Sequence, residues 1–377
     1  MTMAKKLKIL EVTAFSAGIC GVWTRVLAES KLLAKKHEVY VFSSNISRGT
    51  DKIEIADSEE CIDKVHIRRF KTSASFGQNT FFWNFKKEAM KLRPDIIVAH
   101  AYRQYYSTQA LKIAQSLKVP CFLVTHAPFL EKKLRGWKLN AAVSLYDFFI
   151  GKRILNQYKK VIAITHWEIP YLLKLGIKKE KIVYIPNGIP EDFFKLSIKS
   201  HKNKHLLFLG RIAPIKDIET LIRAVSIIKD KSLLLDIVGP AEYKYKSKLV
   251  QLIKNLKLER QVHFHPAVYD IKEKLKIIDS HKIFILPSKR EGMPQALIEA
   301  MARQRVVISS KTDGGKEIVR DGKTGFLFEI GNEKELAKKI SLALKARKKI
   351  SENARESVKK FSWGELIKTV EKIYKVN

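Results

Sequence analysis

The sequence has little of what marks secreted, redox or membrane-spanning proteins. Its 377 residues include only three cysteines, Cys20, Cys61 and Cys121, which lie far apart and show neither metal-ligand nor redox spacing. No stretch of about 18 apolar residues without charge is present, which argues against a spanning helix. The first residues lack the apolar segment and small-residue cleavage site of a signal peptide. We therefore expect free thiols and a cytoplasmic protein.

Acidic residues are scarce relative to basic ones. The chain holds 38 Asp and Glu against 72 Lys and Arg, a formal net charge of +34. Residues 1–190 contain 32 basic and 15 acidic residues, so the two halves share the excess about equally. Such a field attracts nucleotide sugars, phospholipid headgroups and RNA alike. A nucleic-acid-binding domain often concentrates its excess in one patch, so the even spread argues against nucleic acid as the partner.

Strand-like and helix-like segments alternate along the first half of the chain. Several strands are continuous runs rich in Val and Ile, as in a parallel sheet that is covered on both faces. We expect strands at residues 6–13, 37–43, 65–70, 95–100, 120–126, 160–165 and 182–185. Helices are expected between them, including residues 22–36, 82–92 and 105–117. This pattern predicts a doubly wound, Rossmann-like α/β domain over residues 1–189.

A polar, basic stretch at residues 189–204 interrupts the alternation and fits an interdomain linker. Strands are then expected at residues 205–210, 233–239, 262–265, 282–287, 306–310 and 325–328. Helices are expected at residues 217–229, 243–256, 294–302 and 333–346. The sequence therefore predicts a second Rossmann-like domain over residues 204–361, with the two domains facing across a cleft.

The element with the most chemical content follows the strand expected at residues 282–287. Pro294 suits the first turn of a helix, where its missing N–H costs no hydrogen bond. That helix would present free backbone N–H groups and the positive end of its dipole to an anion. Glu291 precedes the helix and Glu299 lies inside it, and carboxylates accept hydrogen bonds from sugar hydroxyls. The combination suits a nucleotide sugar, whereas either glutamate alone is typical of an ordinary surface helix.

A second element, Gly210-Arg211 with Lys216, combines a strand end, a turn and a helix start. Gly210 permits close approach of the backbone to a ligand. Arg211 as a bidentate fork and Lys216 as a compact charge can bind a diphosphate together. Most basic residues of so basic a chain are solvated surface groups. The position of these two at the carboxyl end of a strand favours a binding role.

Four motifs stand in the order and at the spacing of one known family. They are residues 186–189 (PNGI), Gly210-Arg211 with Lys216, the pair Glu291 and Glu299, and residues 313–319 (DGGKEIV). Together they resemble the GT-B-fold retaining glycosyltransferases of family 4, and the resemblance covers nearly the whole chain.

The resemblance implies a role for each matching residue. Arg211 and Lys216 would bind the donor pyrophosphate and stabilise it as the leaving group. Glu291 would hold a sugar hydroxyl near the reacting carbon, and Glu299 would bind the ribose hydroxyls. Backbone N–H groups at Gly292, Met293 and the residues after Pro294 would contact sugar and phosphate.

In this family the N-terminal domain carries the acceptor side. Gly18 and Gly21 follow the first strand, as in the family's glycine-rich loop, and would approach the donor phosphates. A GxGxxG dinucleotide fingerprint is absent, which counts against an NAD-dependent oxidoreductase. His126 matches a family histidine that touches the transferred sugar. We interpret His100 and His166, which also end or follow strands, as structural.

The family's chemistry also implies that no cofactor and no metal takes part. The chain has no obvious DxD-type motif, and two basic groups with a helix end replace the divalent cation used elsewhere. The acceptor would attack the face from which the phosphate leaves, and no residue stands out as a general base or nucleophile. From the family's habit we expect a UDP-sugar donor. The acceptor is expected to be a lipid-linked sugar, a polysaccharide or a small metabolite.

Two stretches of the first domain mix aromatic and basic residues: residues 76–87, and residues 129–153 with Lys132, Lys133, Arg135, Trp137 and Lys138. Such a surface can lie on an anionic membrane or line a lipid-phosphate site. The alternative, aromatics in the core beside solvated lysines, is equally compatible. Residues 362–377 form an amphipathic pattern that is expected to pack back on the first domain.

Three function classes follow from these observations. The leading prediction is sugar transfer to a hydroxyl in glycan, glycolipid or cell-envelope biosynthesis. A GT-B-fold sugar-nucleotide epimerase or phosphorylase is the alternative within the fold. A nucleic-acid-binding protein, suggested by the charge alone, would bind with a steep dependence on salt.

Overall fold

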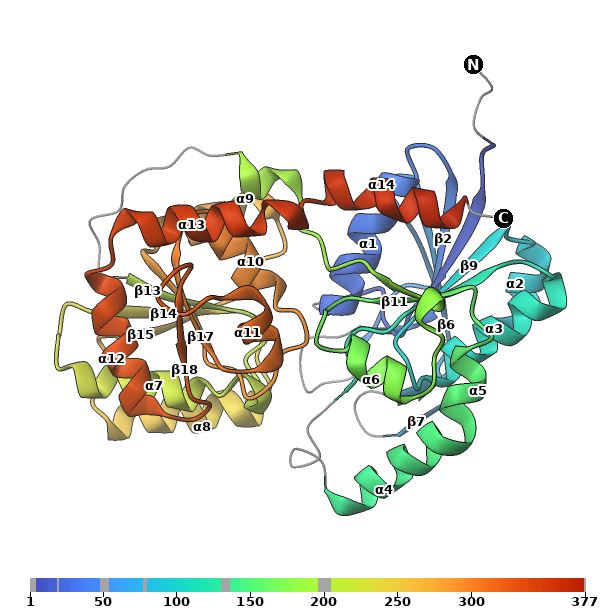
Figure 1. The fold of residues 1–377 in the computed structure, drawn as a ribbon. Coiled ribbons are helices and arrows are strands. Elements are labelled where there is room, and N and C mark those ends of the chain that lie inside the picture. The colour runs from blue at the N-terminus through green and yellow to red at the C-terminus, as the bar shows by residue number, and fades with distance from the viewer. Residues whose placement is uncertain are drawn as a thin grey trace. The chain divides into compact units, whose positions relative to one another are not determined.

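The computed structural model describes residues 5–18, 20–47, 54–76, 80–129, 136–195 and 205–375. The chain divides into two compact units, coloured by chain position in Figure 1. The N-terminal unit holds the described residues up to Asn187 together with those from Leu366 onward, and the C-terminal unit is Gly188–Glu365.

The N-terminal unit is built on an eight-stranded sheet in the order β12-β11-β10-β9-β1-β2-β6-β5. All neighbours are parallel except β5 and β6. Its strands are β1 (Lys8–Val12), β2 (Glu38–Ser44), β5 (Glu59–Ile62), β6 (Val65–Phe70), β9 (Ile96–His100), β10 (Cys121–Val124), β11 (Lys160–Ala163) and β12 (Ile182–Tyr184). Two small antiparallel pairs join β3 (Ile46–Ser47) to β4 (Glu54–Ile55) and β7 (Ala74–Phe76) to β8 (Thr80–Phe82).

Helices follow most of these strands. They are α1 (Gly21–Leu33), α2 (Lys86–Leu92), α3 (Tyr105–Leu117), α4 (Trp137–Tyr146), the π-helical turn η2 (Asp147–Gly151), α5 (Lys152–Leu155), α6 (Ile169–Lys174), the 3₁₀ turn η3 (Lys179–Lys181) and α14 (Trp363–Tyr374). The end of α14 is fastened within this unit, because Tyr374 Oη donates a 3.0 Å hydrogen bond to Glu29 Oε1 on α1.

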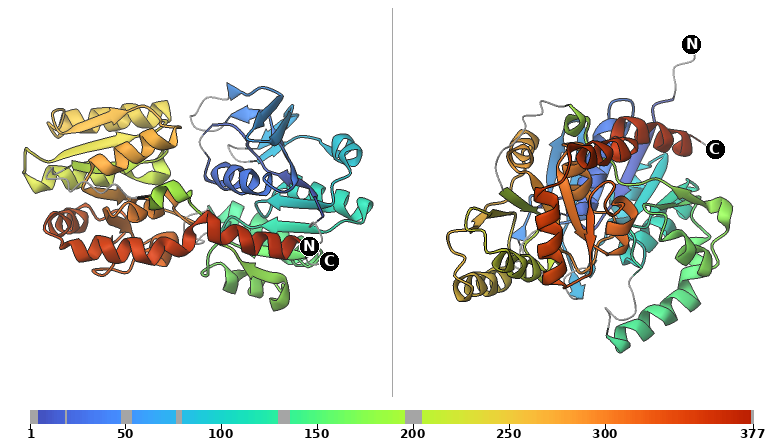
Figure 2. Two further views of the ribbon diagram at one scale, coloured as in Figure 1. Left: turned by 90° about the horizontal axis from the view of Figure 1, so that it is seen from above. Right: turned by 60° about the vertical axis from the view of Figure 1, so that its left-hand side comes forward.

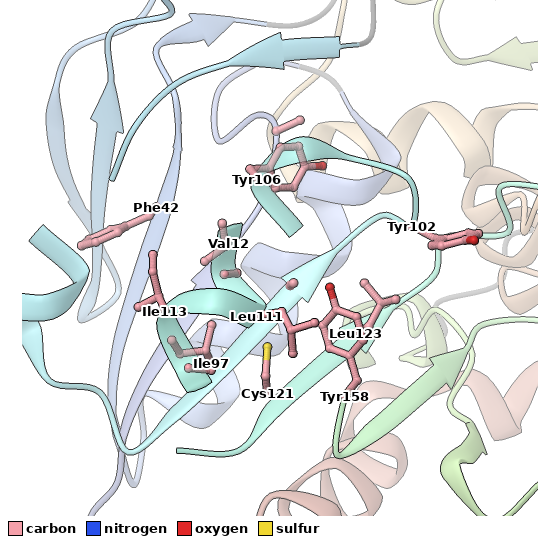
Figure 3. Close-up of a cluster of buried hydrophobic side chains, with 14 of the residues drawn as sticks. Val12, Phe42, Ile97, Tyr102, Tyr106, Leu111, Ile113, Cys121, Leu123 and Tyr158 are labelled. Carbon is pink, nitrogen blue, oxygen red and sulfur yellow. The ribbon is translucent and has the colours of Figure 1, made fainter. Parts of the chain in front are cut away.

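The core of the N-terminal unit explains the apolar strands of the sequence. Val12, Ile97 and Leu123, from three neighbouring strands, lie in one buried cluster with Leu111 and Ile113 of α3 (Figure 3). β9 and β10 are buried along their whole length, as strands covered on both faces are. The rigid centre of the sheet fixes the strand ends from which the chemical groups project.

The C-terminal unit repeats the plan with six parallel strands in the order β15-β14-β13-β16-β17-β18. They are β13 (His205–Leu209), β14 (Leu234–Val238), β15 (Val262–His265), β16 (Ile283–Leu286), β17 (Val306–Ser310) and β18 (Phe326–Phe328). Its helices are α7 (Ile218–Ile228), α8 (Tyr243–Asn255), α9 (Ile271–Ser280), α10 (Gln295–Ala302), α11 (Asp313–Ile318), α12 (Glu333–Leu344) and α13 (Lys348–Val358). Three short 3₁₀ turns are η4 (Glu191–Phe194), η5 (Pro214–Lys216) and η6 (Lys359–Phe361).

Helices cover both faces of the second sheet. Figures 1 and 2 show α9, α10 and α13 on one face and α7, α8 and α12 on the other. In both sheets the strand order reverses beside the first strand, between β1 and β9 and between β13 and β16. Open α/β sheets bind ligands at such switch points, outside the carboxyl ends of the strands.

The predicted strands and most predicted helices are present, with ends that differ by up to three residues. The helix expected at residues 82–92 is wrong at its start, because Thr80–Phe82 pairs with Ala74–Phe76 and the helix begins at Lys86. Within the expected linker, Ile189 bridges to Ser362 and η4 follows, so this part is ordered by tertiary contacts. Residues 196–204 lie outside the described residues. Among the described helices none is long and apolar enough to cross a bilayer.

Candidate active site

Arg211 follows β13 at the switch point of the C-terminal sheet and is held by a carboxylate. Its Nη1 lies 2.6 Å from Oε1 of Glu242, the residue that precedes α8. The carboxyl ends of β13 and β14 approach closely, since a Cβ on Gly239, which follows β14, would lie 2.0 Å from the carbonyl oxygen of Gly210, which follows β13. Gly239 also has a φ of +148°, which favours glycine. The guanidinium is about a quarter exposed, so an anion can reach it.

Lys216, at the end of η5, pairs with Glu291. The distance from Lys216 Nζ to Glu291 Oε1 is 2.6 Å, and Ser288 Oγ donates to the same oxygen at 2.5 Å. The backbone joins the two segments as well, because the Lys289 N–H bonds to the Ile215 carbonyl at 2.9 Å. The loop after β16 and the turn after β13 are therefore one hydrogen-bonded assembly at the strand ends.

The 313–319 motif supports this loop. The Gly314 N–H donates to the Glu291 carbonyl at 3.2 Å, and a Cβ on Gly314 would lie 2.4 Å from the Gly292 carbonyl oxygen. Thr312 caps α11 through its hydroxyl, which accepts from the Gly315 N–H at 3.1 Å. The motif therefore positions Glu291 and Gly292 through backbone contact.

The helix expected to bind an anion is α10, and it begins one residue later than predicted. Pro294 is its N-cap residue rather than part of its first turn, and Met293 and Gly292 precede it. The first N–H groups of a helix have no acceptor within the helix. Since α10 follows the carboxyl end of β16, its amino end lies at the ligand-binding edge of the sheet.

Glu299 lies within α10 but faces a different partner. It is 3% exposed, and its Oε2 lies 2.5 Å from Nζ of Lys274 on α9. Lys274 in turn lies over the ring of Phe193, 5.6 Å from its centroid. The structure therefore joins Glu299 to α9, whereas it joins Glu291 to Lys216.

In the N-terminal unit three titratable side chains form a hydrogen-bonded network at the β1–β9 switch point, with Glu11 and His100 buried and His126 partly exposed. Nε2 of His100 lies 2.6 Å from Oε2 of Glu11, and its Nδ1 lies 3.0 Å from Nε2 of His126. Glu11 and His100 have essentially no exposed surface. His126 follows β10 by two residues, with φ +57°, so it stands in a left-handed turn and not at a strand end as expected.

Burial sets the protonation of this network. It raises the pKa of the Glu11 carboxyl to about 8, against a smaller opposing effect of the Arg25 charge. It lowers the pKa of His100 to about 3 and that of His126 well below the ordinary histidine value. Near neutral pH all three groups are therefore uncharged, with the proton on Glu11.

When Glu11, His100 and His126 are all uncharged, their hydrogen bonds can run in only one direction. If Glu11 O–H donates to His100 Nε2, His100 must carry its own proton on Nδ1 and donate it to His126 Nε2. His126 then carries its proton on Nδ1 and presents it as a donor. Ionisation of Glu11 reverses every bond and turns that nitrogen into an acceptor.

The glycine-rich loop after β1 is described on either side of residue 19. Gly18 has φ +76°, a left-handed conformation that glycine adopts without strain, and Gly21 is the first residue of α1. Arg69 donates to both Oγ and the carbonyl oxygen of Ser16, each at 2.9 Å. The loop is thereby tied to β6.

The PNGI motif has a structural function in each unit. Nη1 of the fully buried Arg25 donates to the carbonyls of Ile185 and Pro186 and to Oδ1 of Asn187, at 3.0 to 3.1 Å. A Cβ on Gly188 would lie 2.5 Å from the indole of Trp363.

The structure thus brings together Lys216, Glu291 and the Gly292 backbone, and it places Arg211 at the end of the strand that leads to Lys216. Three partners escaped the sequence analysis: Glu242, Glu11 and the link from His100 to His126. Glu242 follows a strand's carboxyl end, a signal that could have identified it. Glu11 lies inside an apolar strand, where a lone carboxylate on a buried face should have been noticed.

Comparisons with known proteins bear on the whole chain. Residues 19–193 match the family model described as Glycosyltransferase Family 4, and residues 189–360 match the model of glycosyl transferases group 1. An uncharacterized glycosyltransferase of Methanocaldococcus jannaschii is 31% identical over 290 residues, which cover 74% of this chain and 75% of the relative. The chain belongs to the family 4 glycosyltransferases.

Other relatives of this glycosyltransferase extend over more of its length. A second uncharacterized glycosyltransferase of M. jannaschii is 26% identical over 94% of this chain and 95% of its own. A Campylobacter jejuni enzyme is 25% identical over 90% of this chain and 91% of its own. It is named as an α-1,4-N-acetyl-D-galactosaminyltransferase acting on a saccharide linked to PP-undecaprenol.

Solved structures show the same fold. Sucrose-phosphate synthase from Thermosynechococcus elongatus matches with a TM-score of 0.77 at 18% identity, over 98% of each chain. Anabaena HepE, in complex with UDP and glucose, matches with a TM-score of 0.76 at 18% identity, over 98% of this chain and all of that one. The predicted GT-B fold, family and enzyme class are therefore confirmed for this glycosyltransferase.

Proposed function

We propose that this glycosyltransferase moves a sugar from a UDP-sugar to a hydroxyl acceptor with retention of anomeric configuration and without a catalytic metal. The observation that supports the proposal most is the placement of two cations, Arg211 and Lys216, around the β13 switch point, each held by a carboxylate. HepE, which shares the fold, was solved with UDP and glucose.

On the donor side, the diphosphate takes the place of the two carboxylates that pair with Arg211 and Lys216. Arg211 and Lys216 are each paired with one carboxylate oxygen, at 2.6 Å in both cases. A diphosphate offers them more negative charge than a single carboxylate. At about 4 Å and an effective dielectric constant of about 20, each additional charge pair contributes roughly 4 kcal/mol. The same two cations stabilise the leaving diphosphate, where charge grows as the bond to the sugar breaks.

Glu291 connects the phosphates to the sugar. Its Oε1 receives Lys216 and Ser288, and its backbone carbonyl receives Gly314, so the side chain is held in one orientation. A carboxylate accepts several hydrogen bonds, and the second oxygen can accept one from a sugar hydroxyl. We assign Glu299 to the ribose hydroxyls, with Lys274 holding it in place.

His126 contacts the transferred sugar through its Nδ1–H in this proposal. A neutral N–H donor can bind a hydroxyl oxygen of the sugar, and Glu11 and His100 fix the tautomer. The bond between the anomeric carbon and the diphosphate breaks, the acceptor oxygen bonds to that carbon from the same face, and the acceptor's hydroxyl proton passes to the departing diphosphate oxygen.

We further propose a lipid-linked acceptor at an anionic membrane. The Campylobacter relative is named for a PP-undecaprenol acceptor. In the N-terminal unit α4 and η2 extend from the body of the unit (Figure 1), and none of the residues of α4 is buried. Trp137, Leu145, Phe148 and Phe149 are all more than half exposed. Exposed aromatic side chains on a strongly basic chain favour binding to an anionic bilayer. Lys132, Lys133 and Arg135 lie outside the described residues.

Hydrolysis of the donor tests the proposal even before the acceptor is identified. The purified protein is incubated with UDP-glucose, UDP-galactose and their N-acetyl forms, and the first-formed anomer of the released sugar is read by NMR. An α-sugar released from an α-linked donor, at a rate that EDTA leaves unchanged, supports retention and metal-independent transfer. A β-sugar would contradict retention, and loss of the activity in EDTA would contradict metal independence.

A further inference from the structure

Four of the ten histidines gather around one carboxylate in the C-terminal unit. Asp236 on β14 has its Oδ2 2.8 Å from Nε2 of His281 and its Oδ1 2.8 Å from Nε2 of His265. Nδ1 of His263 lies 3.7 Å from Oδ1. The His205 ring meets His281 edge-on, with 5.9 Å between centroids. One nitrogen or oxygen from each of His205, Asp236 and His281 lies within 4.8 Å of the other two.

The hydrogen bonds of His281 call for a cation at its Nε2. Its Nδ1 lies 2.7 Å from the carbonyl oxygen of Ile277, which only accepts, so Nδ1 carries a proton. In a neutral ring Nε2 would then point its lone pair at a carboxylate oxygen 2.8 Å away. Either a second proton or a metal ion must lie between these two atoms. A histidine that ligates through one nitrogen and donates the other N–H to a backbone carbonyl is the usual arrangement in metal sites.

The surroundings suit an ion that enters from solvent. Side-chain exposure is 7% for His281 and 18% for Asp236, whereas His205 is only half-buried. Among the described residues no side chain hydrogen-bonds to the His205 ring. A half-buried imidazole to which no described side chain hydrogen-bonds, close to a buried imidazole and a carboxylate, can offer a nitrogen to a ligand.

We propose that His205, Asp236 and His281 bind one divalent transition-metal ion, with Zn²⁺ the best match. Two imidazoles and a carboxylate are Zn²⁺ ligands, whereas Mg²⁺ and Ca²⁺ take oxygen. Ligand atoms around tetrahedral Zn²⁺ lie about 3.3 Å apart, given bonds of about 2.0 to 2.1 Å. The Asp236–His281 separation is 2.8 Å and all three ligand atoms lie within 4.8 Å of one another, so side-chain rotations can bring them to that spacing. His265 fixes the other Asp236 oxygen.

This metal site is distinct from the proposed transfer site. His205 is the first residue of β13, and Gly210 follows its last, so about 16 Å of strand separates them at about 3.3 Å per residue. The ligands come from β13, from β14 and from the residue after α9, two positions before β16. These three strands are neighbours in the sheet. The ion therefore links the segments of three neighbouring strands, and its binding free energy adds to the stability of the folded unit.

The test is Zn²⁺ binding by the full chain, prepared without a histidine tag and stripped with EDTA. Competition with a chromophoric chelator gives the stoichiometry and the affinity, and thermal unfolding gives the stabilisation. Co²⁺ serves as a second probe, because its visible spectrum reports nitrogen–oxygen coordination. The variants are His205→Ala and Asp236→Asn, and His66→Ala, which removes an exposed histidine of the N-terminal unit, is the matched control.

We expect one Zn²⁺ per chain, a raised unfolding temperature, and a loss of affinity of at least about tenfold in His205→Ala and Asp236→Asn but not in His66→Ala. His205→Ala is the decisive variant, because His205 is only partly buried and circular dichroism verifies that the variant folds. Absence of stoichiometric Zn²⁺ binding would overturn the proposal, as would binding that both site variants retain unchanged.

Discussion

Lys216 and Glu291 form one ion pair, with 2.6 Å between Nζ and Oε1, although 75 residues separate them. The lysine is assigned to the donor diphosphate and the glutamate to a hydroxyl of the sugar. In the proposed function, their contact couples binding of the phosphates to the group that would hold the sugar. Ser288 donates to the same carboxylate oxygen, a contact that would keep Glu291 in place if Lys216 turned to the phosphates.

Removing the Lys216 charge should impair catalysis far more than folding. In Lys216→Ala we expect kcat/KM for donor turnover to fall roughly 100- to 1,000-fold, as for loss of one preorganised electrostatic contact to the transition state. Steady-state UDP release measures it. Lys311→Ala, which breaks an exposed lysine–glutamate pair in the same unit, should stay within about twofold of the wild type. Equal losses in the two variants would refute a specific role for Lys216.

Glu11 should set the alkaline limit of activity. As pH rises through about 8, Glu11 loses its proton, the hydrogen bonds through His100 reverse, and His126 ceases to be a donor. We expect kcat/KM of the wild type to fall above about pH 8. Glu11→Gln supplies a permanent N–H donor to His100 and should move that fall to higher pH. An unchanged pH profile in Glu11→Gln would show that the hydrogen bonds from Glu11 through His100 to His126 have no influence on the reaction.

The same carboxyl should make stability depend on pH. Burial raises the pKa of this carboxyl from its ordinary value of 4.5 to about 8, so the folded state holds the proton more tightly than the unfolded state. Stability from this group is present below the unfolded pKa and is lost as pH rises through about 8. Between pH 6.5 and 8 the loss is about 1 to 2 kcal/mol. Thermal unfolding of wild type and Glu11→Gln measures it. The difference between them should shrink with falling pH, whereas a constant difference would contradict this prediction.

Arg25 should be essential to the stability of the N-terminal unit. It is fully buried, bonds to the PNGI segment, and its Nε lies 3.3 Å from Oε2 of Glu29. Arg25→Met leaves Glu29 without its cation and should cost about 3 to 5 kcal/mol. Hydrogen exchange of α1 and the unfolding midpoint report the loss. Arg68→Met, at a more exposed ion pair of the same unit, should cost at most about 1 kcal/mol.

The aromatic residues of η2 should govern membrane binding. Phe148→Glu with Phe149→Glu removes two exposed aromatic rings and adds negative charge. We expect binding to vesicles with anionic lipid, measured by cosedimentation, to fall at least about tenfold. Tyr269→Glu, at an equally exposed ring of the C-terminal unit, serves as the control. Vesicle binding that is equal in all three proteins would exclude this surface as the membrane contact.

The sequence predicted what local pattern determines. Buried runs such as Ile283–Leu286 identify central strands, and glycine, arginine and lysine after a strand identify a binding edge. Contacts between segments that are distant in the sequence could not be predicted from local patterns. Glu11 and His100 are 89 residues apart and meet only because β1 pairs with β9, while Arg211 meets Glu242 because β13 pairs with β14. The α4 helix escaped notice because no face of it is buried, so it shows no apolar periodicity.

Nucleotide binding distinguishes a sugar-nucleotide site from a dinucleotide or RNA site. Thermal unfolding of the wild type, Lys216→Ala and Glu299→Ala is followed with UDP, GDP, ADP and their common sugars, beside NAD and a short RNA. A ligand at a hundredfold excess over its dissociation constant contributes about 2.7 kcal/mol to stability. The account predicts stabilisation by UDP and one UDP-sugar, lost in both variants. Stabilisation by NAD or RNA alone, or by UDP to the same extent in all three proteins, would contradict it.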